Sequence, residues 1–290
     1  MPSAPSGADL PFLDHLAADS ARFRQVLADA PAGATVPTCP DWDTDDLLWH
    51  LADVQWFWGG IAQGRLTTSE QVEAHSDTRP ERPADRAGLL AAFDASSARL
   101  HEQLSQLPAD TELWMWADEH TAGYIRRRQA HEALIHRLDA EATAGIAPAD
   151  RTPIDARLAA DGVDEALRIM RGYEPEPGLS HEQLGAPVTV ATVDTMHAWT
   201  VTPVRVTGTY DGRDIDLLRF LVADGPAGGA LPDATDGTGT SDDASAPEVC
   251  GTAADLDCWL WNRPLAGELS RSGDAAARAA VDAVLRGSID

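Results

Sequence analysis

The sequence predicts an α+β protein of two domains, a four-helix bundle over residues 1–148 followed by a smaller α+β domain over residues 149–290. Two patterns predict this division. Apolar residues recur at helical spacing through most of the first half, whereas Val- and Thr-rich segments alternate with period two in the second half. The length of 290 residues is sufficient for two domains that each bury a core.

The first half contains four segments with helical periodicity. We expect helices over residues 10–28, 44–64, 83–107 and 122–144. Thr44 is the expected N-cap of the second helix, because Asp45 and Asp46 then lie in its positively polarised first turn. Gly145 is placed to end the fourth helix. Four helices joined by loops of moderate length indicate a bundle.

The second half begins after a segment rich in Pro, Gly and small polar residues, residues 145–153. One helix is expected over residues 154–171, strands over residues 187–194, 199–209 and 216–223, and further helices over residues 253–261 and 274–285. Thr252 is the expected N-cap of the first of these last two helices. The Gly-, Asp-, Thr- and Ser-rich segment 224–247 cannot support a packed core, so we expect a mobile loop there.

The composition excludes several classes of partner. Asp and Glu number 47 against 22 Lys and Arg, which gives a net charge of -25 at pH 7. Such a surface repels nucleic-acid phosphates and anionic lipid. The sequence shows neither a basic segment followed by an apolar one at its start nor a long apolar stretch later, so we expect a cytoplasmic protein that does not enter membranes. Cys39, Cys250 and Cys258 form no CxxC pair and are interpreted as reduced, structural thiols.

Candidate metal ligands lie on two of the predicted helices. Glu132 and His136 are ~40° apart around the fourth helix, whereas His131 is ~140° from His136. Glu132 and His136 can therefore share one ion, as paired ligands on one helix face do in other metalloenzymes. His50 on the second helix is the third candidate, because apolar residues one turn away on either side direct it toward the bundle interior.

The same residues also allow plainer interpretations. His50 is also compatible with a core histidine bonded to a backbone carbonyl, and Glu132 with His136 could form a solvated helix pair. Asp139 either orients a ligand imidazole or forms an ion pair with an arginine at the helix surface. Arg137 is taken to mark the polar face of the helix. Three nitrogen and carboxylate ligands leave a fourth position open, as in catalytic zinc sites; zinc fits best, and nickel, cobalt and iron remain open.

Tryptophan is frequent near these positions. Six of these residues either line an apolar pocket or pack in the core: Trp42, Trp49, Trp56, Trp58, Trp114 and Trp116.

Three segments carry a resemblance to a known family. VPTCPDWDTDDLLWHLADVQWF, RRRQAHEALIHRLDAE and VCGTAADLDCWLWNRP resemble, in this order, the mycothiol-dependent maleylpyruvate isomerase family, whose bundle belongs to the DinB-like superfamily. The resemblance covers most of the chain. It implies a DinB-like metal-binding bundle followed by a small α+β domain related to sterol-carrier folds.

The resemblance also implies a site and a cosubstrate. Zinc, or another divalent metal, is expected on His50, Glu132 and His136, with mycothiol, the actinobacterial counterpart of glutathione, as its thiol partner. Arg263 is implied as a catalytic and cofactor-binding residue that holds a carboxylate of the thiol or the substrate. The alternative for Arg263 is an arginine at the carboxyl end of a helix that complements the helix dipole.

The expected function is therefore that of a maleylpyruvate-isomerase-like cis–trans isomerase or a thiol S-transferase. In either, a metal-activated thiolate adds to a small electrophilic substrate. Two alternatives remain, a non-catalytic protein that binds metal or a small ligand, and a hydrolase that uses metal-bound water. We expect a monomer or a small homo-oligomer.

Overall fold

The computed structural model describes residues 10–31, 33–225 and 248–287. The chain forms two compact units, Leu10–Arg151 and the described residues from Thr152 onward. The first is helical, and the second is a mixed β-sheet with helices, which confirms the predicted α+β class. The segment 224–247, expected to be a mobile loop, lies outside the described residues from residue 226 onward. Within the described residues no helix is long and apolar enough to cross a bilayer.

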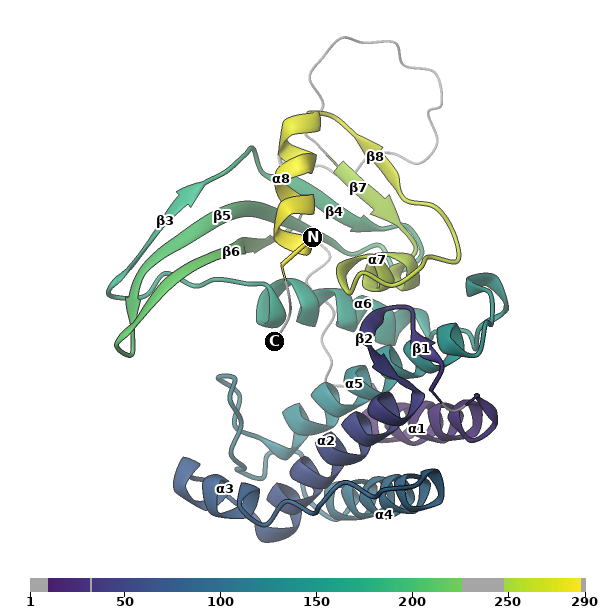
Figure 1. Cartoon of the computed structure of the whole chain (residues 1–290). Coiled ribbons are helices and arrows are strands. Elements are labelled where there is room, and N and C mark those ends of the chain that lie inside the picture. Colours follow the sequence, from purple (N-terminus) through teal and green to yellow (C-terminus); the bar gives the residue numbers. More distant parts are fainter. Residues whose placement is uncertain (1–9, 32, 226–247, 288–290) are drawn as a thin grey trace. The chain divides into compact units, whose positions relative to one another are not determined.

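The helical unit is a bundle of four long helices (Figure 1). They are α1 (Phe12–Asp29), α2 (Thr44–Gly64), α4 (Arg86–Ser105) and α5 (Ala122–Thr143), each within a few residues of its predicted range. Both α1 and α2 pack against α4 and α5. The core between them includes Phe23, Leu27, Leu47, Leu51 and Phe93, all of which are buried. The helical periodicity of the first half therefore correctly predicted the bundle.

Four short elements of this unit were not predicted. Helix α3 (Ser69–Ser76) follows α2, a hairpin of β1 (Thr35–Val36) and β2 (Cys39–Asp43) precedes α2, and a single 3-10 turn over Pro148–Asp150 follows α5. Helix α3 buries only Val72, so it has no apolar stripe for a sequence pattern to detect.

The N-cap of α2 is Asp43 and not Thr44, so that prediction is wrong by one residue. The Asp43 carboxylate accepts hydrogen bonds from the backbone N–H groups of Asp45 and Asp46, and Asp46 in turn accepts from the backbone of Asp43. Thr44 is buried, and its hydroxyl donates to the Pro31 carbonyl at 3.1 Å. The carboxylate forms a reciprocal capping box, while the threonine hydroxyl serves the loop before it.

The second unit contains a six-stranded sheet. Its strands are β3 (Leu179–Gln183), β4 (Val188–Thr192), β5 (Ala198–Tyr210), β6 (Arg213–Asp224), β7 (Glu248–Gly251) and β8 (Ser270–Ser272). Their order is β3-β5-β4-β7-β8, with β6 paired to β5, and only the β4–β7 pair is parallel. Asp211 and Gly212, both with positive φ, join β5 to β6 in a two-residue turn. The three predicted strands correspond to β4, β5 and β6.

Three helices accompany this sheet. They are α6 (Ala156–Glu165), which continues as a π-helical turn over Ala166–Met170, α7 (Ala253–Leu260) and α8 (Ala275–Leu285). Thr252 caps α7 as predicted, because its hydroxyl accepts from the backbone N–H of Asp255. Helix α8 packs against β4, β5 and β6, and α7 packs against α6 (Figure 1).

Arg171, directly after the π-helical turn, ties two of these helices together. It is buried and donates to the carbonyls of Leu260 and Val284, where α7 and α8 end. Burial lowers the pKa of this guanidinium to about 10. These carbonyl groups lie in the last turns of their helices, where no helical N–H follows four residues later.

Candidate metal centre

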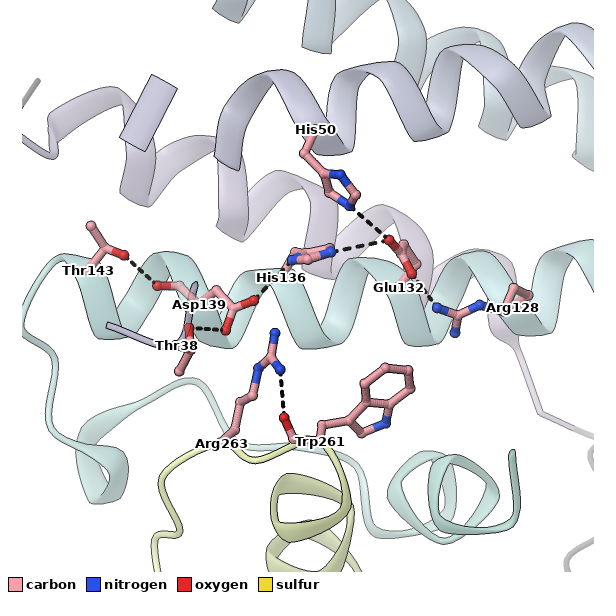
Figure 2. A network of polar contacts seen from close by, with 9 residues as sticks. All are labelled: Thr38, His50, Arg128, Glu132, His136, Asp139, Thr143, Trp261 and Arg263. Carbon is pink, nitrogen blue, oxygen red and sulfur yellow. Dashed lines mark hydrogen bonds and ion pairs between the residues drawn. The ribbon is translucent and has the colours of Figure 1, made fainter. Parts of the chain in front are cut away.

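His50, Glu132 and His136 converge between α2 and α5 (Figure 2). One carboxylate oxygen, Glu132 Oε1, lies 3.3 Å from His50 Nε2 and 3.2 Å from His136 Nε2. One ligand atom from each residue lies within 4.8 Å of the other two. The two imidazole rings meet edge to face, with centroids 4.6 Å apart. The three side chains thus present two nitrogens and one oxygen to a common point.

The two helices explain this convergence. Glu132 and His136 are one turn apart on α5 and share a face, while His50 projects from the facing side of α2. The Trp42 ring, from β2, lies 4.7 Å from the His50 ring and 6.3 Å from the His136 ring. His131 instead packs edge to face against Phe12 of α1, at 6.1 Å, as its different position around the helix predicts.

Asp139 sets the orientation of the His136 ring. Its Oδ2 lies 3.0 Å from His136 Nδ1, and its Oδ1 accepts a hydrogen bond of 2.6 Å from the Thr38 hydroxyl (Figure 2). Asp139 is fully buried, so it does not lie at the helix surface. A proton on Nδ1 that is shared with a carboxylate leaves the Nε2 lone pair directed at the other two candidate ligands.

Neighbouring charges at this centre shift the pKa values of Glu132 and His136. Burial alone would raise the pKa of Glu132, but the charge of Arg128 and hydrogen bonds from His136 and His50 hold it well below its usual range. Arg128 contacts the second oxygen of the Glu132 carboxylate. Burial would lower the pKa of His136, yet its hydrogen bonds to Asp139 and Glu132 outweigh burial and raise it to about 9. Without an ion, an imidazolium therefore occupies the place of the positive charge at neutral pH.

The donor set suits a divalent cation of borderline softness. Two imidazole nitrogens and one carboxylate oxygen are the ligands of catalytic zinc sites, and the Asp139 contact is the usual support of such an imidazole. The His50 side chain is 32% exposed, whereas Glu132 and His136 are 15% and 10% exposed. An ion and a further small ligand could therefore enter past His50.

Arg137 does not mark a polar face of α5, so that expectation is wrong. Its side chain is 1% exposed and forms ion pairs with Asp19 of α1 and with Glu141, each at 2.9 Å. Helix α5 is buried around most of its circumference between residues 128 and 141. A charged residue there must find its partner inside the protein, which a helical wheel alone does not reveal.

Arg263 belongs to the second unit, where it follows α7. Its Nη1 donates to the Trp261 carbonyl at 2.6 Å, as drawn in Figure 2, and its backbone N–H donates to the Cys258 carbonyl. These contacts are those of an arginine at the carboxyl end of a helix. Its role in binding a carboxylate of thiol or substrate stays a prediction.

The cysteines do not form a nucleophilic centre of their own. All three are free thiols. Cys39 packs against the bundle core and Cys258 is buried. Burial raises the pKa of the Cys250 thiol to about 12, and a hydrogen bond to Glu248 and the negative charge of Glu248 contribute in the same direction. Cys250 is therefore not a source of thiolate at neutral pH.

Known proteins share this architecture. The model of the mycothiol maleylpyruvate isomerase N-terminal domain family matches residues 13–141, which contain all three candidate ligands. A crystal structure of the mycothiol-dependent maleylpyruvate isomerase is 13% identical, with a TM-score of 0.53, and one of a histidine-to-alanine mutant of that enzyme is 12% identical, with a TM-score of 0.55. Each match covers 92% of this chain and 95% of the other chain. At such identities the likeness shows the fold. No curated protein sequence matches this chain.

Proposed function

We propose that this chain is a divalent-metal-dependent enzyme that uses a low-molecular-weight thiol, because residues 13–141 match the model of the mycothiol maleylpyruvate isomerase N-terminal domain family. Its substrate would be a small electrophile, and its reaction a cis–trans isomerisation or a thiol S-transfer. The observation that carries this proposal is the convergence of His50, Glu132 and His136 on one point. Zinc is the ion that these donors suit best, and mycothiol is the proposed thiol.

Each residue of the candidate centre has a distinct role in this proposal. When bound, a divalent cation supplies the positive charge that stabilises a thiolate at neutral pH, where a free thiol with a pKa of about 8.5 is mostly protonated. His136 would lose its Nε2 proton and keep its Nδ1 proton, which is hydrogen-bonded to Asp139. Arg128 holds the Glu132 carboxylate in place through its second oxygen. The Trp42 ring packs beside both imidazole rings.

The proposed chemistry then follows from the thiolate. Its sulfur adds to the electrophilic carbon of a cis-enone or cis-enoate to give an enolate, rotation occurs about the former double bond, and elimination regenerates the thiolate and releases the trans product. In a transferase the protonated adduct leaves as product. We further propose that Arg263 pairs with a carboxylate of the thiol or the substrate, because a guanidinium matches a carboxylate with two parallel hydrogen bonds.

Metal content and thiol-dependent turnover test this proposal together. His136→Ala removes a ligand, so the purified variant should lose the metal found in the wild type and with it the thiol-dependent consumption of an electrophile. His131→Ala is the matched control, because it makes the same change on the same helix at a side chain that faces Phe12. Absence of metal from the wild type, or equal metal content in the two variants, would remove the basis for the proposal.

The same measurements separate the alternatives. A metal-dependent hydrolase would turn over without added thiol. A binding protein would hold the metal and consume no electrophile with any thiol tested. Arg263→Gln should raise KM for the thiol or the substrate and leave metal content unchanged.

A further inference from the structure

A second feature of the helical unit has no part in the metal centre. A cavity of about 250 Å³ lies beside α2, lined by the aromatic residues Trp56, Phe57 and Trp58 and by Val54, Asp53 and Arg79. Val54 is one helical turn beyond His50, so the cavity begins on the same face of α2 as that candidate ligand. Its lining is mainly apolar, with two charged groups of opposite sign.

Helix α3 and the turn after it form one wall of the cavity. His75 stacks on the Trp56 ring, with centroids 4.3 Å apart and planes at 27°, and its Nε2 donates to the Phe57 carbonyl at 3.2 Å. Gly60 makes this docking possible, because a Cβ there would lie 2.2 Å from the His75 ring. In the turn, the backbone N–H of Arg79 donates to the Ser76 carbonyl. These contacts fix the position of Arg79 on the cavity wall.

Two further contacts orient the Arg79 guanidinium. The Arg79 Nε donates to Asp53 Oδ1 at 2.6 Å, and the Arg79 Cζ lies 6.0 Å from the centroid of the Trp49 ring. Among the described residues no other hydrogen bond or ion pair of this guanidinium is found, so both Nη nitrogens remain to bind a ligand. The side chain is 55% exposed and accessible to a small molecule. Two parallel N–H groups of an arginine are the usual partner of a carboxylate.

We propose that this cavity binds a small carboxylate with a flat, apolar body. The body would lie against the aromatic rings of Trp56, Phe57 and Trp58, and the carboxylate would accept hydrogen bonds from the Nη groups of Arg79. The assignment of this ligand as the electrophilic substrate rests on the proposed function. The binding itself requires neither metal nor thiol, so the two proposals can fail separately.

The chain offers a matched pair of variants for the test. Arg79 pairs with Asp53 of α2, and Arg82 pairs with Asp46 of α2, each at 2.6 Å and each partly exposed. Only the first pair lines the cavity. Arg79→Gln and Arg82→Gln should therefore affect stability alike and weakly, since exposed ion pairs contribute little. They should differ only in ligand binding.

The experiment is an NMR titration of the metal-free protein with benzoate and with benzamide, followed through the indole N–H signals. Benzoate should shift the signals of Trp56 or Trp58, and benzamide should bind more weakly. Arg79→Gln should weaken benzoate binding about tenfold or more, because it removes a charged hydrogen-bonding partner, whereas Arg82→Gln should bind as the wild type does.

Val54→Phe adds a control that keeps Arg79 in place. It should fill the cavity and abolish benzoate binding while the far-ultraviolet circular dichroism stays unchanged. Equal benzoate affinity of the wild type and Arg79→Gln, or equal weakening in Arg79→Gln and Arg82→Gln, would overturn the proposal. Benzoate binding that persists in a chain without thiol-dependent turnover would keep the cavity assignment and remove the proposed function.

Discussion

The hydrogen bond between His136 and Asp139 determines how the candidate centre should respond to both substitution and pH. Asp139→Asn keeps the size and shape of the side chain and removes its charge. The Thr38 hydroxyl, which now donates to Asp139 Oδ1 at 2.6 Å, can rotate and accept from the new amide. The substitution should therefore leave the bundle folded, and its main effect should be on metal affinity.

Two effects of opposite sign combine at neutral pH. Loss of a buried partner that orients a ligand imidazole weakens metal binding by about 10- to 100-fold. The pKa of His136 is about 9 in the metal-free site, so at pH 7 a metal ion must displace a proton, which lowers the apparent affinity of the wild type about 100-fold. The Asp139 carboxylate helps to raise that pKa, so Asp139→Asn relieves part of this competition.

The sign of the pH dependence follows. Apparent affinity of the wild type should rise from pH 7 to pH 9 and level off above pH 9, and that of Asp139→Asn should rise less. The loss caused by the substitution should thus be larger at pH 9 than at pH 7. Competition for zinc between the metal-free protein and a chelator at the two pH values measures this. Thr143→Ala is the control, because the Thr143 hydroxyl donates to the backbone carbonyl of Asp139 and not to its carboxylate. Unchanged affinity in Asp139→Asn, or an equal loss at both pH values, would refute the reasoning.

Three further substitutions test the packing of each unit. Arg137→Met should lower the free energy of unfolding by about 3–5 kcal/mol, because it removes the guanidinium that pairs with the buried Asp19 and Glu141, although Arg22 still pairs with Glu141. Arg24→Gln, which breaks an exposed ion pair, should cost less than about 1 kcal/mol; urea denaturation compares the two variants. Gly60→Ala should displace the His75 ring and increase the hydrogen-exchange rate of α3, with little change in α5. Arg171→Met should destabilise the second unit, seen as a lower midpoint of its thermal unfolding, while metal binding stays as in the wild type.

Local patterns were sufficient to predict that Glu132 and His136 lie together on α5. Glu132 and His136 are one turn apart, so their shared face follows from helix geometry alone. His50 required a further assumption, because only the apolar residues around it indicated the direction of its side chain. The Arg128 contact could have been predicted from its position four residues before Glu132. The Thr38 contact could not, because Thr38 and Asp139 are separated by 101 positions and meet only through the β1–β2 hairpin.

The strands show the same dependence on local signal. Strands β4 and β5 bury many of their residues and are rich in Val and Thr, which made them recognisable. Strand β3 is exposed along nearly its whole length, and β8 has only three residues, all exposed. Neither contains an apolar alternation, so their pairing depends on neighbours far away in the sequence. Arg137 was misplaced for a related reason, since its partner Asp19 lies on another helix.

His50, His136 and Arg128 all contact the Glu132 carboxylate, and this arrangement bears on how a metal ion would bind. In many small zinc domains the ligands come together only when the metal binds, so metal uptake and folding are one event. Here the candidate ligands lie on two long helices of a bundle with its own packed apolar core. Loading should therefore be a docking step on a finished scaffold. We expect that the folded chain can be stripped of metal and reloaded with different ions, so that metal preference can be compared on one and the same folded protein.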